Sequence, residues 1–484
     1  MSITVSPVSA AVSRPAIMGL GVSVGLATVA GLLLTAGYAL HPLWWAPWLA
    51  PVPLIVAGQA GAGRSEARQA RIAGGIAGLI ALVSVLPYYI EMNGWTATIL
   101  IALLRISSWI FASRLAQAAA RRLPLGLAML VLPAAIAALE MLTLAISPHG
   151  AAGSLAYSQM DMPGAVQVAA LGGVPAVVFV VLLPGSLAGL LLTRDWPRAQ
   201  AISGLAAAAA AGAAIALFTL VRLNAPATGP MVPVTMIATD RFPTISPDWD
   251  PVWEVYRSAV EHSAKEGGLV VLPEKIALLD RQGSESAAAM VAETARMTRA
   301  TIVVGIEVKD AGLYRNRALV AGPDGRTAWY DKQRPVPGWE ARDVPGKTPL
   351  LADLAGARFG VAICKDMHIP AIAREYADAA ALLAVPAWDF GQDGWMGARM
   401  SALRAVENGY AMARSARDGF VGAYDRAGRV LTERASGQGV TVADAALPAT
   451  GHETIYARIG DVFGWTTVTA VLLLLVWFRR PIAG

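Results

Sequence analysis

The chain contains little cysteine, little lysine and few charges for its length. Cys364 is the only cysteine among 484 residues, which excludes a disulfide within the chain. Charged residues make up only 15% of the sequence, whereas hydrophobic residues make up 55%. The mean hydropathy is +0.51. This composition excludes an ordinary soluble protein and predicts that much of the chain lies in a membrane.

Long apolar stretches predict eight membrane spans. They are Ile17–Leu40, Leu43–Ala57, Ile72–Ile90, Thr96–Leu115, Leu125–Ile146, Val166–Leu192, Ala199–Val221 and Val462–Phe478. The second is the weakest, because it is short and contains three prolines, and a re-entrant or kinked element is the alternative. The first is too long for the core of a signal peptide and is followed directly by further apolar stretches, so we expect it to be retained as a span.

Arginines occur in every second connection between the predicted spans. They are Arg14, Arg64, Arg68, Arg71, Arg121, Arg122, Arg194, Arg198, Arg479 and Arg480. The intervening connections, around residues 41–42, 91–94 and 147–165, contain no lysine or arginine. This asymmetry follows the positive-inside rule and predicts that both termini are cytoplasmic and that Arg222–Asp461 lies on the outer face. The basic residues thus indicate membrane orientation, and no nucleic-acid partner is expected.

The sequence divides into a membrane bundle of seven spans at 1–223, an outer domain at 224–461, and a last span with its tail at 462–484. In the outer domain, short apolar runs that predict strands alternate with amphipathic stretches that predict helices. The strands are expected at Val232–Ala238, Leu269–Leu272, Thr301–Ile306, Ala318–Ala321, Phe359–Ile363 and Ala381–Val385, and the helices at Trp249–Glu266, Ser284–Arg299, Ile369–Asp378 and Trp395–Arg414. This alternation predicts an α/β domain whose sheet is buried on both faces.

Three residues of the outer domain indicate acyl transfer through a thiol. Lysine is scarce, with six in the chain against 33 arginines, and Lys332 closely follows a predicted strand and turn. Glu274 and Cys364 each stand at the end of a predicted strand. A thiol that attacks a carbonyl needs a base for its proton and a cation or donors for the oxyanion. The three residues together meet these needs, although each taken alone is more often a surface, turn or core residue.

These residues and their neighbours resemble the Glu-Lys-Cys triad of the nitrilase, or carbon–nitrogen hydrolase, superfamily. The matching segments are Leu272-Pro273-Glu274, Tyr330-Asp331-Lys332 and Ile363-Cys364-Lys365-Asp366. The flanking spans are similar to those of the superfamily's membrane branch, the apolipoprotein N-acyltransferases, and so are the segments Gly153–Gln159 and Thr454–Asp461. Glu340 follows Lys332 by eight residues in a Val-Pro-Gly segment, as in that branch, where a second glutamate assists the triad. The resemblance implies a multi-pass α-helical membrane bundle joined to an α-β-β-α sandwich.

The resemblance also implies a role for each residue. Glu274 is the general base, Cys364 the nucleophile that accepts the acyl chain, and Glu340 a supporting acid or base. Lys332 and a backbone N–H beside Cys364 would stabilise the oxyanion. A lysine near the thiol also predicts that the pKa of Cys364 lies below its ordinary value of about 8.5.

The implied partners are a phospholipid acyl donor, a lipoprotein acceptor that carries a diacylglyceryl-cysteine, and membrane lipids. No cofactor is implied. The implied location is the inner membrane of a bacterium, crossed several times, with the catalytic domain in the periplasm.

Two departures from the family leave the substrate open. Lys365 and Asp366 replace an aromatic residue and a glutamate after the cysteine, and Pro386–Gly391 look more like the matching loop of soluble amidases. The alternative is therefore a membrane-tethered amidase of the same superfamily, or an acyltransferase with a different substrate. A non-enzymatic paralogue is a third possibility, against which the retained triad and Glu340 argue.

Four further residues are predicted to bind substrate. Lys365 would attract the phosphate of a lipid headgroup, or else be a solvated lysine that points away from the site. Asp366 keeps the charge of the family's glutamate with a shorter reach. Trp339 and Trp388 would line an acyl groove, or anchor the domain at the membrane surface.

Isolated polar residues elsewhere carry weaker predictions. His262 and His368 lack the spacing of metal ligands, so no metal site is expected. Arg105 and Glu140 fall inside predicted spans, where charge is costly, and we expect a structural pair, with contact to lipid headgroups as the second reading.

Overall fold

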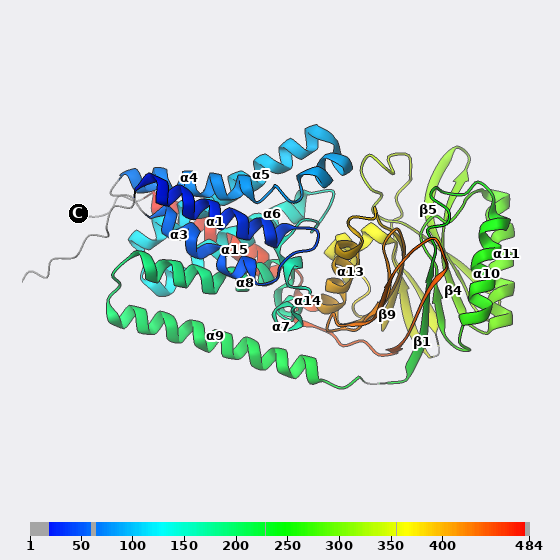
Figure 1. Cartoon of the computed structure of the whole chain (residues 1–484). Helices are drawn as coiled ribbons and strands as arrows, with labels where there is room; N and C mark the ends of the chain where they lie inside the picture. The colour runs from blue at the N-terminus through cyan, green and yellow to red at the C-terminus, as the bar shows by residue number, and fades with distance from the viewer. Residues whose placement is uncertain (1–18, 60–63, 228, 355, 480–484) are drawn as a thin grey trace, which may run out of the picture.

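The computed structural model describes residues 19–59, 64–227, 229–354 and 356–479. A bundle of helices forms one end of the molecule, and two stacked sheets with their covering helices form the other (Figure 1). The beginning of the expected first span, Arg14 and Arg480 lie outside the described residues.

Long apolar helices make up the bundle. They are α1 (Leu20–Tyr38), α2 (Ala46–Leu49), α3 (Pro51–Gly58), α4 (Arg64–Ile80), α5 (Leu86–Arg122), α6 (Leu125–Ile146), α8 (Ala169–Thr193), α9 (Arg198–Asn224) and α15 (Val462–Phe478). Between α6 and α8 the chain forms the short helices η1 (Leu155–Gln159) and α7 (Pro163–Val166). Five helices of the described residues, α1, α5, α6, α8 and α9, are long and apolar enough to cross a membrane. The segment Ala46–Gly58 and α15 are shorter apolar helices, so the expected count of eight spans is not confirmed.

Two of the expected spans differ from the helices that form. The prediction of one span over Ile72–Ile90 is wrong, because α4 ends at Ile80 and α5 begins at Leu86 with Pro87 in its first turn. Proline is favoured in a first turn, where its missing N–H costs nothing, so it begins a new helix there. The proline-rich second stretch likewise forms two short helices, α2 and α3, each of which has a proline in its first turn.

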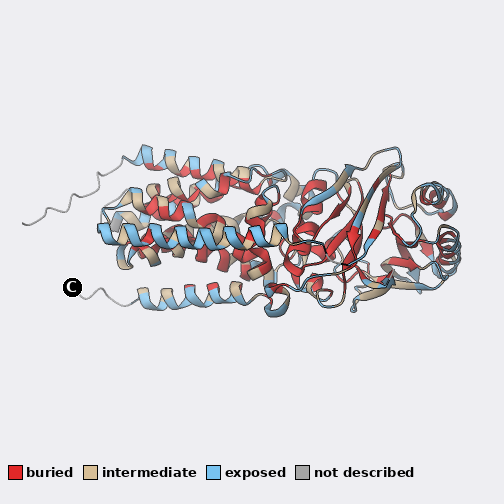
Figure 2. Cartoon of the chain, turned by 90° about the horizontal axis from the view of Figure 1, so that it is seen from below, coloured by how far each residue is buried: buried red, intermediate tan, exposed pale blue. Residues whose placement is uncertain are grey.

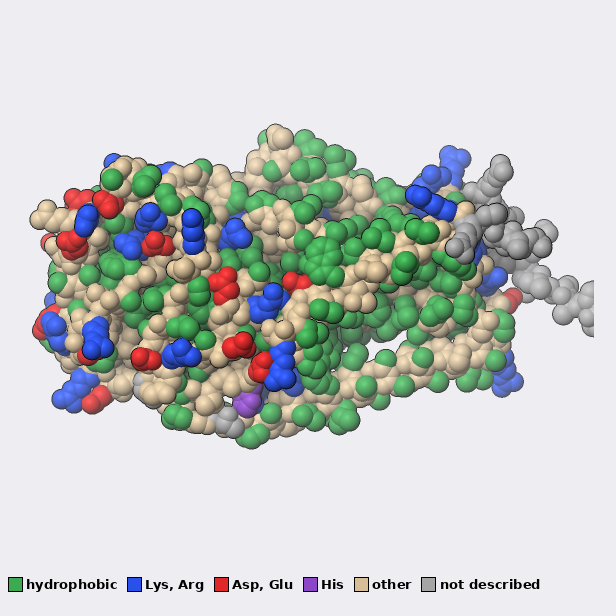
Figure 3. All heavy atoms as spheres, turned by 180° about the vertical axis from the view of Figure 1, so that it is seen from behind, with side chains coloured by type: hydrophobic (Ala, Val, Ile, Leu, Met, Phe, Trp, Pro, Cys, Tyr) green, Lys and Arg blue, Asp and Glu red, His purple; other side chains and the backbone are tan. Residues whose placement is uncertain are grey.

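The outer faces of the bundle are exposed although they are apolar (Figure 2). Such continuous apolar exposure is what lipid, and not water, accommodates. Arginines gather at the end of the bundle far from the sheets (Figure 3). There Arg121 pairs with Glu66 of α4 at 3.3 Å, Arg122 donates to the carbonyl of Phe478 in α15 at 2.5 Å, and Arg194 donates to a carbonyl near the end of α5. Arg121, Arg122 and Arg194, which contributed to the orientation prediction, thus lie at the same end of the bundle.

The remainder of the chain forms two sheets. The first contains β1 (Met231–Ala238), β2 (Leu269–Val271), β3 (Leu278–Asp280), β4 (Thr301–Asp310), β5 (Leu313–Ala321), β6 (Thr327–Asp331) and β13 (Thr441–Pro448), in the order β13-β1-β2-β4-β5-β6 with β3 beside β4. The second contains β7 (Leu350–Leu354), β8 (Ala357–Val361), β9 (Leu382–Trp388), β10 (Ala411–Arg417), β11 (Phe420–Tyr424) and β12 (Val430–Ala435), in the order β12-β11-β10-β9-β8-β7. The parallel pairs β1–β2, β2–β4, β8–β9 and β9–β10 lie at the centres of the two sheets.

Helices cover the outer face of each sheet, which gives the expected α-β-β-α sandwich. The helices α10 (Trp249–Ser263) and α11 (Arg281–Thr298) cover the first sheet on the side away from the bundle (Figure 1). The helices α12 (Pro370–Arg374) and α13 (Gly394–Asn408) cover the second sheet and contact the bundle. Because α13 lies between a sheet and the bundle, every one of its residues is buried.

One expected helix is partly a strand. The prediction of a helix over Trp395–Arg414 is wrong beyond Asn408, where α13 ends and β10 soon begins. The next residue, Gly409, has φ of 81°, a left-handed conformation that ends helices and that glycine adopts at no steric cost. The chain then turns back into the middle of the second sheet, between β9 and β11.

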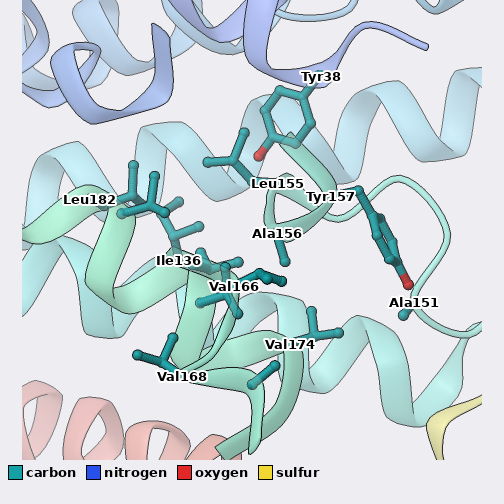
Figure 4. Close-up of a cluster of buried hydrophobic side chains, with 14 of the residues drawn as sticks. Tyr38, Ile136, Ala151, Leu155, Ala156, Tyr157, Val166, Val168, Val174 and Leu182 are labelled. Atoms are coloured by element: carbon teal, nitrogen blue, oxygen red, sulfur yellow. The ribbon is translucent and has the colours of Figure 1, made fainter. Parts of the chain in front are cut away.

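The loop that joins α6 to α8 is built into the core of the bundle. Leu155 and Tyr157 of η1 lie among the side chains of α6 and α8, close to Tyr38 of α1 (Figure 4). The two expected charges within the spans hold this loop and do not pair directly. Arg105 donates to the carbonyl of Gly153 at 2.9 Å, and Glu140 accepts from the amide of Leu155 at 3.1 Å and from the hydroxyl of Ser154. The predicted ion pair is therefore replaced by two separate anchors of the same loop.

Candidate active site

Three strand ends meet at the edge where the two sheets come together. Glu274 follows β2 after a Leu-Pro step, and Lys332 directly follows β6, both in the first sheet. Cys364 follows β8 of the second sheet and begins the short helix η2 (Cys364–His368). The amide of Glu274 donates to the carbonyl of Ala387 in β9 at 3.2 Å, which ties the two sheets together at this edge. The fold therefore brings the three predicted residues into one region.

Lys332 lies between two carboxylates. Its Nζ is 2.7 Å from Oε1 of Glu274 and 2.8 Å from Oε2 of Glu340, and its side chain is buried. Burial lowers the pKa of Lys332, but the two carboxylates raise it by more, so that it lies well above its ordinary value. Lys332 therefore remains a cation at any physiological pH and can stabilise negative charge, but it cannot act as a base.

Two polar residues that the motif does not contain complete this arrangement. Nδ2 of Asn316, in β5, donates to Glu274 at 2.5 Å and to Glu340 at 2.8 Å. Nζ of Lys275 lies 2.8 Å from Oε1 of Glu340, and it also contacts two further carboxylates. Burial raises the pKa of Glu340, but Lys332 and Lys275 lower it by more, so that it lies well below its ordinary value. A carboxylate held in this way favours positioning of Lys332 over the acid or base role that the resemblance implies.

Cys364 occupies a strained position at the turn after β8. Its φ is 42°, in the left-handed region that L-residues adopt at a cost of about 1 kcal/mol or more. The thiol is half-buried, and Sγ lies 3.7 Å from the carbonyl oxygen of Trp388 at the end of β9. At this turn the thiol is close enough to Glu274 and Lys332 for both of their charges to act on it.

The surroundings of Cys364 keep the thiol protonated. Burial and the negative charge of Glu274 raise the pKa of Cys364 well above its ordinary value, although Lys332 lowers it. The expectation that a nearby lysine gives a pKa below the ordinary value is therefore wrong, because burial and the carboxylate outweigh the ammonium group. Attack by this sulfur thus requires a base that takes the proton, and Glu274 is the carboxylate whose charge acts on it most strongly.

Asp366 stabilises the turn at Cys364 through hydrogen bonds. It is fully buried, and its two oxygens accept hydrogen bonds from the amide of Ile363 at 3.0 Å, the hydroxyl of Tyr330 at 2.8 Å, and the amides of Gln333 and Arg334. These bonds join the turn that holds Cys364 to the segment that follows Lys332. Asp366 thereby fixes the position of Cys364 relative to Lys332, and its oxygens accept from protein donors.

Lys365 is buried at the junction with the bundle. It is only 2% exposed, which rules out the solvated lysine of the alternative reading. Its Nζ lies 3.3 Å from Nδ1 of His149, which belongs to the loop after α6. The amide of Ala151 in the same loop donates to the carbonyl of His368 at 2.9 Å. The loop from the bundle therefore contacts η2 at both the side chain and the backbone.

The two predicted tryptophans lie in separate segments beside the site, Trp388 at the end of β9 and Trp339 in the loop after β6. Trp388 is partly buried, and its Nε1 donates to Asp418 at 2.8 Å while its carbonyl oxygen faces Cys364. Trp339 is 57% exposed and packs against Phe390 with ring centroids 5.1 Å apart. Trp388 thus contacts Cys364 directly, whereas Trp339 lies at the surface.

The first turns of α5 reach both loops. Within the segment Leu86–Asn93, the hydroxyl of Tyr88 donates to Asp393 at 2.6 Å and Glu91 accepts from Gln392 at 2.5 Å. The carbonyl of Met92 in this segment accepts from Nε1 of Trp339 at 3.2 Å. The bundle therefore contacts the loop that carries Trp339 and Glu340 as well as the loop after Trp388.

Several residues of the site were missed by sequence reasoning. Lys275 directly follows Glu274 and is one of only six lysines in the chain. The scarcity of lysine, which drew attention to Lys332, could therefore also have indicated Lys275. Asn316 is a buried amide in an otherwise mixed strand, and Asp389 and Arg414 form a buried pair with contacts of 2.9 and 2.5 Å. His149 lies in a different part of the chain, and no local pattern indicates it. Among the described residues, no group of three or more His, Cys, Asp or Glu side chains is arranged to hold a metal ion.

Comparison with known proteins matches both parts of the chain. Residues 30–187 match the family described as apolipoprotein N-acyltransferase N-terminal domain, and residues 244–458 match the carbon–nitrogen hydrolase family. An apolipoprotein N-acyltransferase of Geobacter metallireducens is 25% identical over 516 residues, which cover 94% of this chain and 95% of that protein. One of Rhodopseudomonas palustris is 34% identical over 107 residues, or 20% of each chain.

Two solved structures are similar to nearly half of the chain. XC1258 of Xanthomonas campestris, a CN-hydrolase superfamily protein, is 21% identical with a TM-score of 0.41, and the alignment covers 46% of this chain and 91% of that one. An amidase of Nesterenkonia sp. AN1 is 20% identical with a TM-score of 0.40, and the alignment covers 48% of this chain and 94% of that one.

Proposed function

Because the chain belongs to the apolipoprotein N-acyltransferase family, we propose that it moves an acyl chain from a phospholipid to a lipoprotein. The acceptor is the N-terminal amino group of an S-diacylglyceryl-cysteine, and the acyl chain passes through a thioester on Cys364. One observation carries the proposal: a buried Glu274–Lys332 ion pair of 2.7 Å lies beside a thiol at the edge of the domain that contacts the bundle. A thiol in this place can meet an ester at the membrane surface.

In the first half-reaction, Glu274 takes the proton of the Cys364 thiol as the sulfur attacks the ester carbonyl of the phospholipid. The carbonyl oxygen becomes negative in the tetrahedral intermediate, and Lys332, with a backbone N–H beside Cys364, stabilises it. Such a donor typically contributes about 10²–10³ in rate. The bond from carbonyl carbon to the glycerol oxygen then breaks. That oxygen takes the proton from Glu274, so that lysophospholipid leaves and the acyl thioester remains.

In the second half-reaction, the free amino group of the lipoprotein attacks the thioester. The new bond is an amide, the carbon–sulfur bond breaks, and Glu274 takes a proton from the amine and returns it to the sulfur. The same base and the same cation serve both halves, as expected for ping-pong chemistry. Glu340 would keep Lys332 in place throughout, supported by Lys275 and Asn316.

The proposed location is the inner membrane of a bacterium, with the sandwich domain in the periplasm. The arginine-rich end of the bundle supports this orientation, because it is the end far from the sheets. We also propose the division at 1–223, 224–461 and 462–484, with α9 leading into the sandwich and α15 returning to the bundle.

The test is complementation of a bacterial strain whose own N-acyltransferase can be switched off. We expect the wild-type chain to restore growth and mass spectrometry to find a third acyl chain on lipoprotein N-termini. The Cys364→Ala variant, made at the same level, should restore neither. Failure of the wild-type chain, together with release of ammonia from small amides by the purified protein, would favour the membrane-tethered amidase suggested by the Pro386–Gly391 loop.

A further inference from the structure

Lys365 is a buried cation that forms no salt bridge with a carboxylate of the described residues, although the charge of Glu340 acts on it from a longer distance. The other buried lysines, Lys275 and Lys332, each pair with carboxylates within 3.2 Å. Lys365 forms no ion pair among the described residues, where its Nζ contacts the ring of His149. A buried charge is costly unless it is paired, so an unpaired one indicates that its partner arrives from outside the chain.

The partner of Lys365 within the chain is neutral. Burial lowers the pKa of His149 to about 4, and the charge of Lys365 contributes to this. At neutral pH, Nδ1 of His149 therefore accepts one of the three N–H donors of Lys365 and leaves two for another group. Burial also lowers the pKa of Lys365 to about 8, with Lys332 as the next cause. Further positive charge comes from Arg334, whose exposed side chain is near enough to act on Lys365.

This pair lies just beyond the end of an apolar helix of the bundle. The helix α6 ends at Ile146, which is 80% exposed on the apolar outer surface of the bundle, and His149 follows three residues later. Headgroup phosphates lie where apolar helix faces give way to polar loops. The ring of His149 is half-exposed, so the pair can be approached from this side. Because Lys365 is adjacent to Cys364, a group that it holds is also close to the reacting ester.

We propose that Lys365, with His149 beside it, binds the phosphodiester of the acyl donor and so selects phosphate-bearing lipids for attack by Cys364. This inference rests on the proposed acyl transfer and adds the residues that recognise the phosphate of the donor. A phosphate oxygen accepts from the free N–H groups of Lys365, as ammonium–phosphate contacts do in proteins. The bundle thus contributes a residue to substrate binding through the loop after α6.

The first experiment compares two donors with the same acyl esters, phosphatidylglycerol and diacylglycerol, which lacks phosphate. The full chain in detergent is incubated with each donor, and the acyl thioester on Cys364 is measured over time. The wild-type protein should prefer phosphatidylglycerol. Lys365→Met should reduce that preference about tenfold or more, through a higher KM for phosphatidylglycerol, and change the KM for diacylglycerol much less.

Two variants serve as controls. Lys365→Arg retains a cation and should recover most of the preference, which separates loss of charge from loss of structure. Lys265→Met makes the same change at an exposed lysine beyond α10 and should leave the preference as in the wild-type protein. An unchanged donor preference in Lys365→Met overturns the proposal.

A second measurement does not depend on turnover. Because Cys364 is the only cysteine, its alkylation by iodoacetamide reports on this site alone. Short-chain phosphatidylglycerol should slow alkylation of the wild-type protein more than inorganic phosphate does at equal concentration, and the difference should be lost in Lys365→Met. Equal protection by inorganic phosphate would assign the pair to free phosphate and overturn the headgroup assignment. Absence of a thioester with either donor would contradict the proposed function instead, and the protection experiment would still decide the phosphate site.

Discussion

The charges around Cys364 divide the chemistry between separate residues. Lys332 stays protonated because Glu274 and Glu340 hold it, and Cys364 stays a thiol because burial and Glu274 disfavour its anion. Of these residues, Glu274 is therefore the one that we propose takes the proton from the thiol. In the proposed mechanism, the nucleophile is therefore generated during the reaction, and no reactive thiolate is stored.

The Glu274→Gln variant separates ionisation of the thiol from turnover. Removal of this negative charge should lower the pKa of Cys364, because Glu274 raises it in the wild-type protein. Alkylation at pH 7 should therefore become faster, and the midpoint of its pH profile should move to lower pH. Acyl transfer should fall by about 10²–10⁴, the usual contribution of a general base. The exposed Glu293→Gln is the matched control, and slower alkylation together with normal turnover would contradict the assignment.

The positive charge of Lys275 balances the negative charge of a buried group of carboxylates near Glu274, Lys332 and Cys364. Its Nζ contacts Glu307 at 3.2 Å, Glu340 at 2.8 Å and Asp343 at 2.8 Å. We expect Lys275→Met to reduce the free energy of unfolding by about 3–5 kcal/mol, the usual cost of leaving a buried charge unpaired. Thermal unfolding in detergent measures this, with the exposed Lys309→Met as control. If the two variants unfold at the same temperature, the network does not stabilise the fold.

At the scale of elements, the central strands could be predicted and the outer ones could not. The strands β1, β2, β4, β8 and β9 read as continuous apolar runs because they are buried on both faces. The edge strand β12 has polar and charged residues along its exposed length and carries no such signal. The strand β10 contains Arg414, whose burial is explained only by Asp389 at the end of β9.

The same distinction holds for the site. Glu274, Lys332 and Cys364 lie in short local motifs, so the sequence indicates them. Asn316 and His149 act through contacts between distant segments, which local patterns do not encode. The pKa of Cys364 could not be predicted either, because it depends on the balance of burial, Glu274 and Lys332 in three dimensions.

The helix α5 contains a break that shapes the approach to the site. Gly94 has φ of 71° and ψ of 172°, a conformation essentially restricted to glycine, and it divides the segment Leu86–Asn93 from the rest of the helix. That segment makes the hydrogen bonds to Asp393, Gln392 and Trp339. The break therefore allows the beginning of α5 to contact both active-site loops while the remainder stays in the bundle.

The Gly94→Ala variant tests this element. No atom lies within 4 Å of a Cβ at Gly94, so the substitution acts through backbone strain alone. We expect a loss of about 1–3 kcal/mol and faster hydrogen exchange in Leu86–Asn93. Gly126 in α6 also has open space around a Cβ but no positive φ, so Gly126→Ala should leave stability unchanged or slightly raised. Equal behaviour of the two variants would show that the break is not under strain.

In the whole molecule, the stacking of helices and sheets places the candidate active site next to the bundle. The helix α13 is buried between the second sheet and the bundle. It carries the fully buried pair Arg404–Glu407, whose Nη1 and Oε2 atoms lie 3.1 Å apart. Tyr157 of η1 accepts from Arg404 at 3.4 Å. The segment Gly153–Gln159, noted for its likeness to the family, thus helps to join the two halves of the molecule.

The orientation of the whole molecule in the membrane can be tested with reporter fusions. Alkaline phosphatase is active only outside the cytoplasm, so a fusion at Gly283, at the start of α11, should be active. A fusion at Gly63, which lies outside the described residues, should be inactive because it adjoins an arginine-rich connection. The reverse pattern would invert the proposed topology and move the sandwich into the cytoplasm.

The most direct test of the account is the mass of the intact protein after incubation with phosphatidylglycerol in the absence of an acceptor. We predict that the wild-type chain gains the mass of one acyl group and loses it on treatment with hydroxylamine, which cleaves thioesters. Cys364→Ala should gain no mass, and Cys364→Ser should gain little, because an alkoxide is far harder to generate than a thiolate with the same base. Acylation of Cys364→Ala, or transfer to an acceptor peptide at a near-normal rate by that variant, would contradict the central claim.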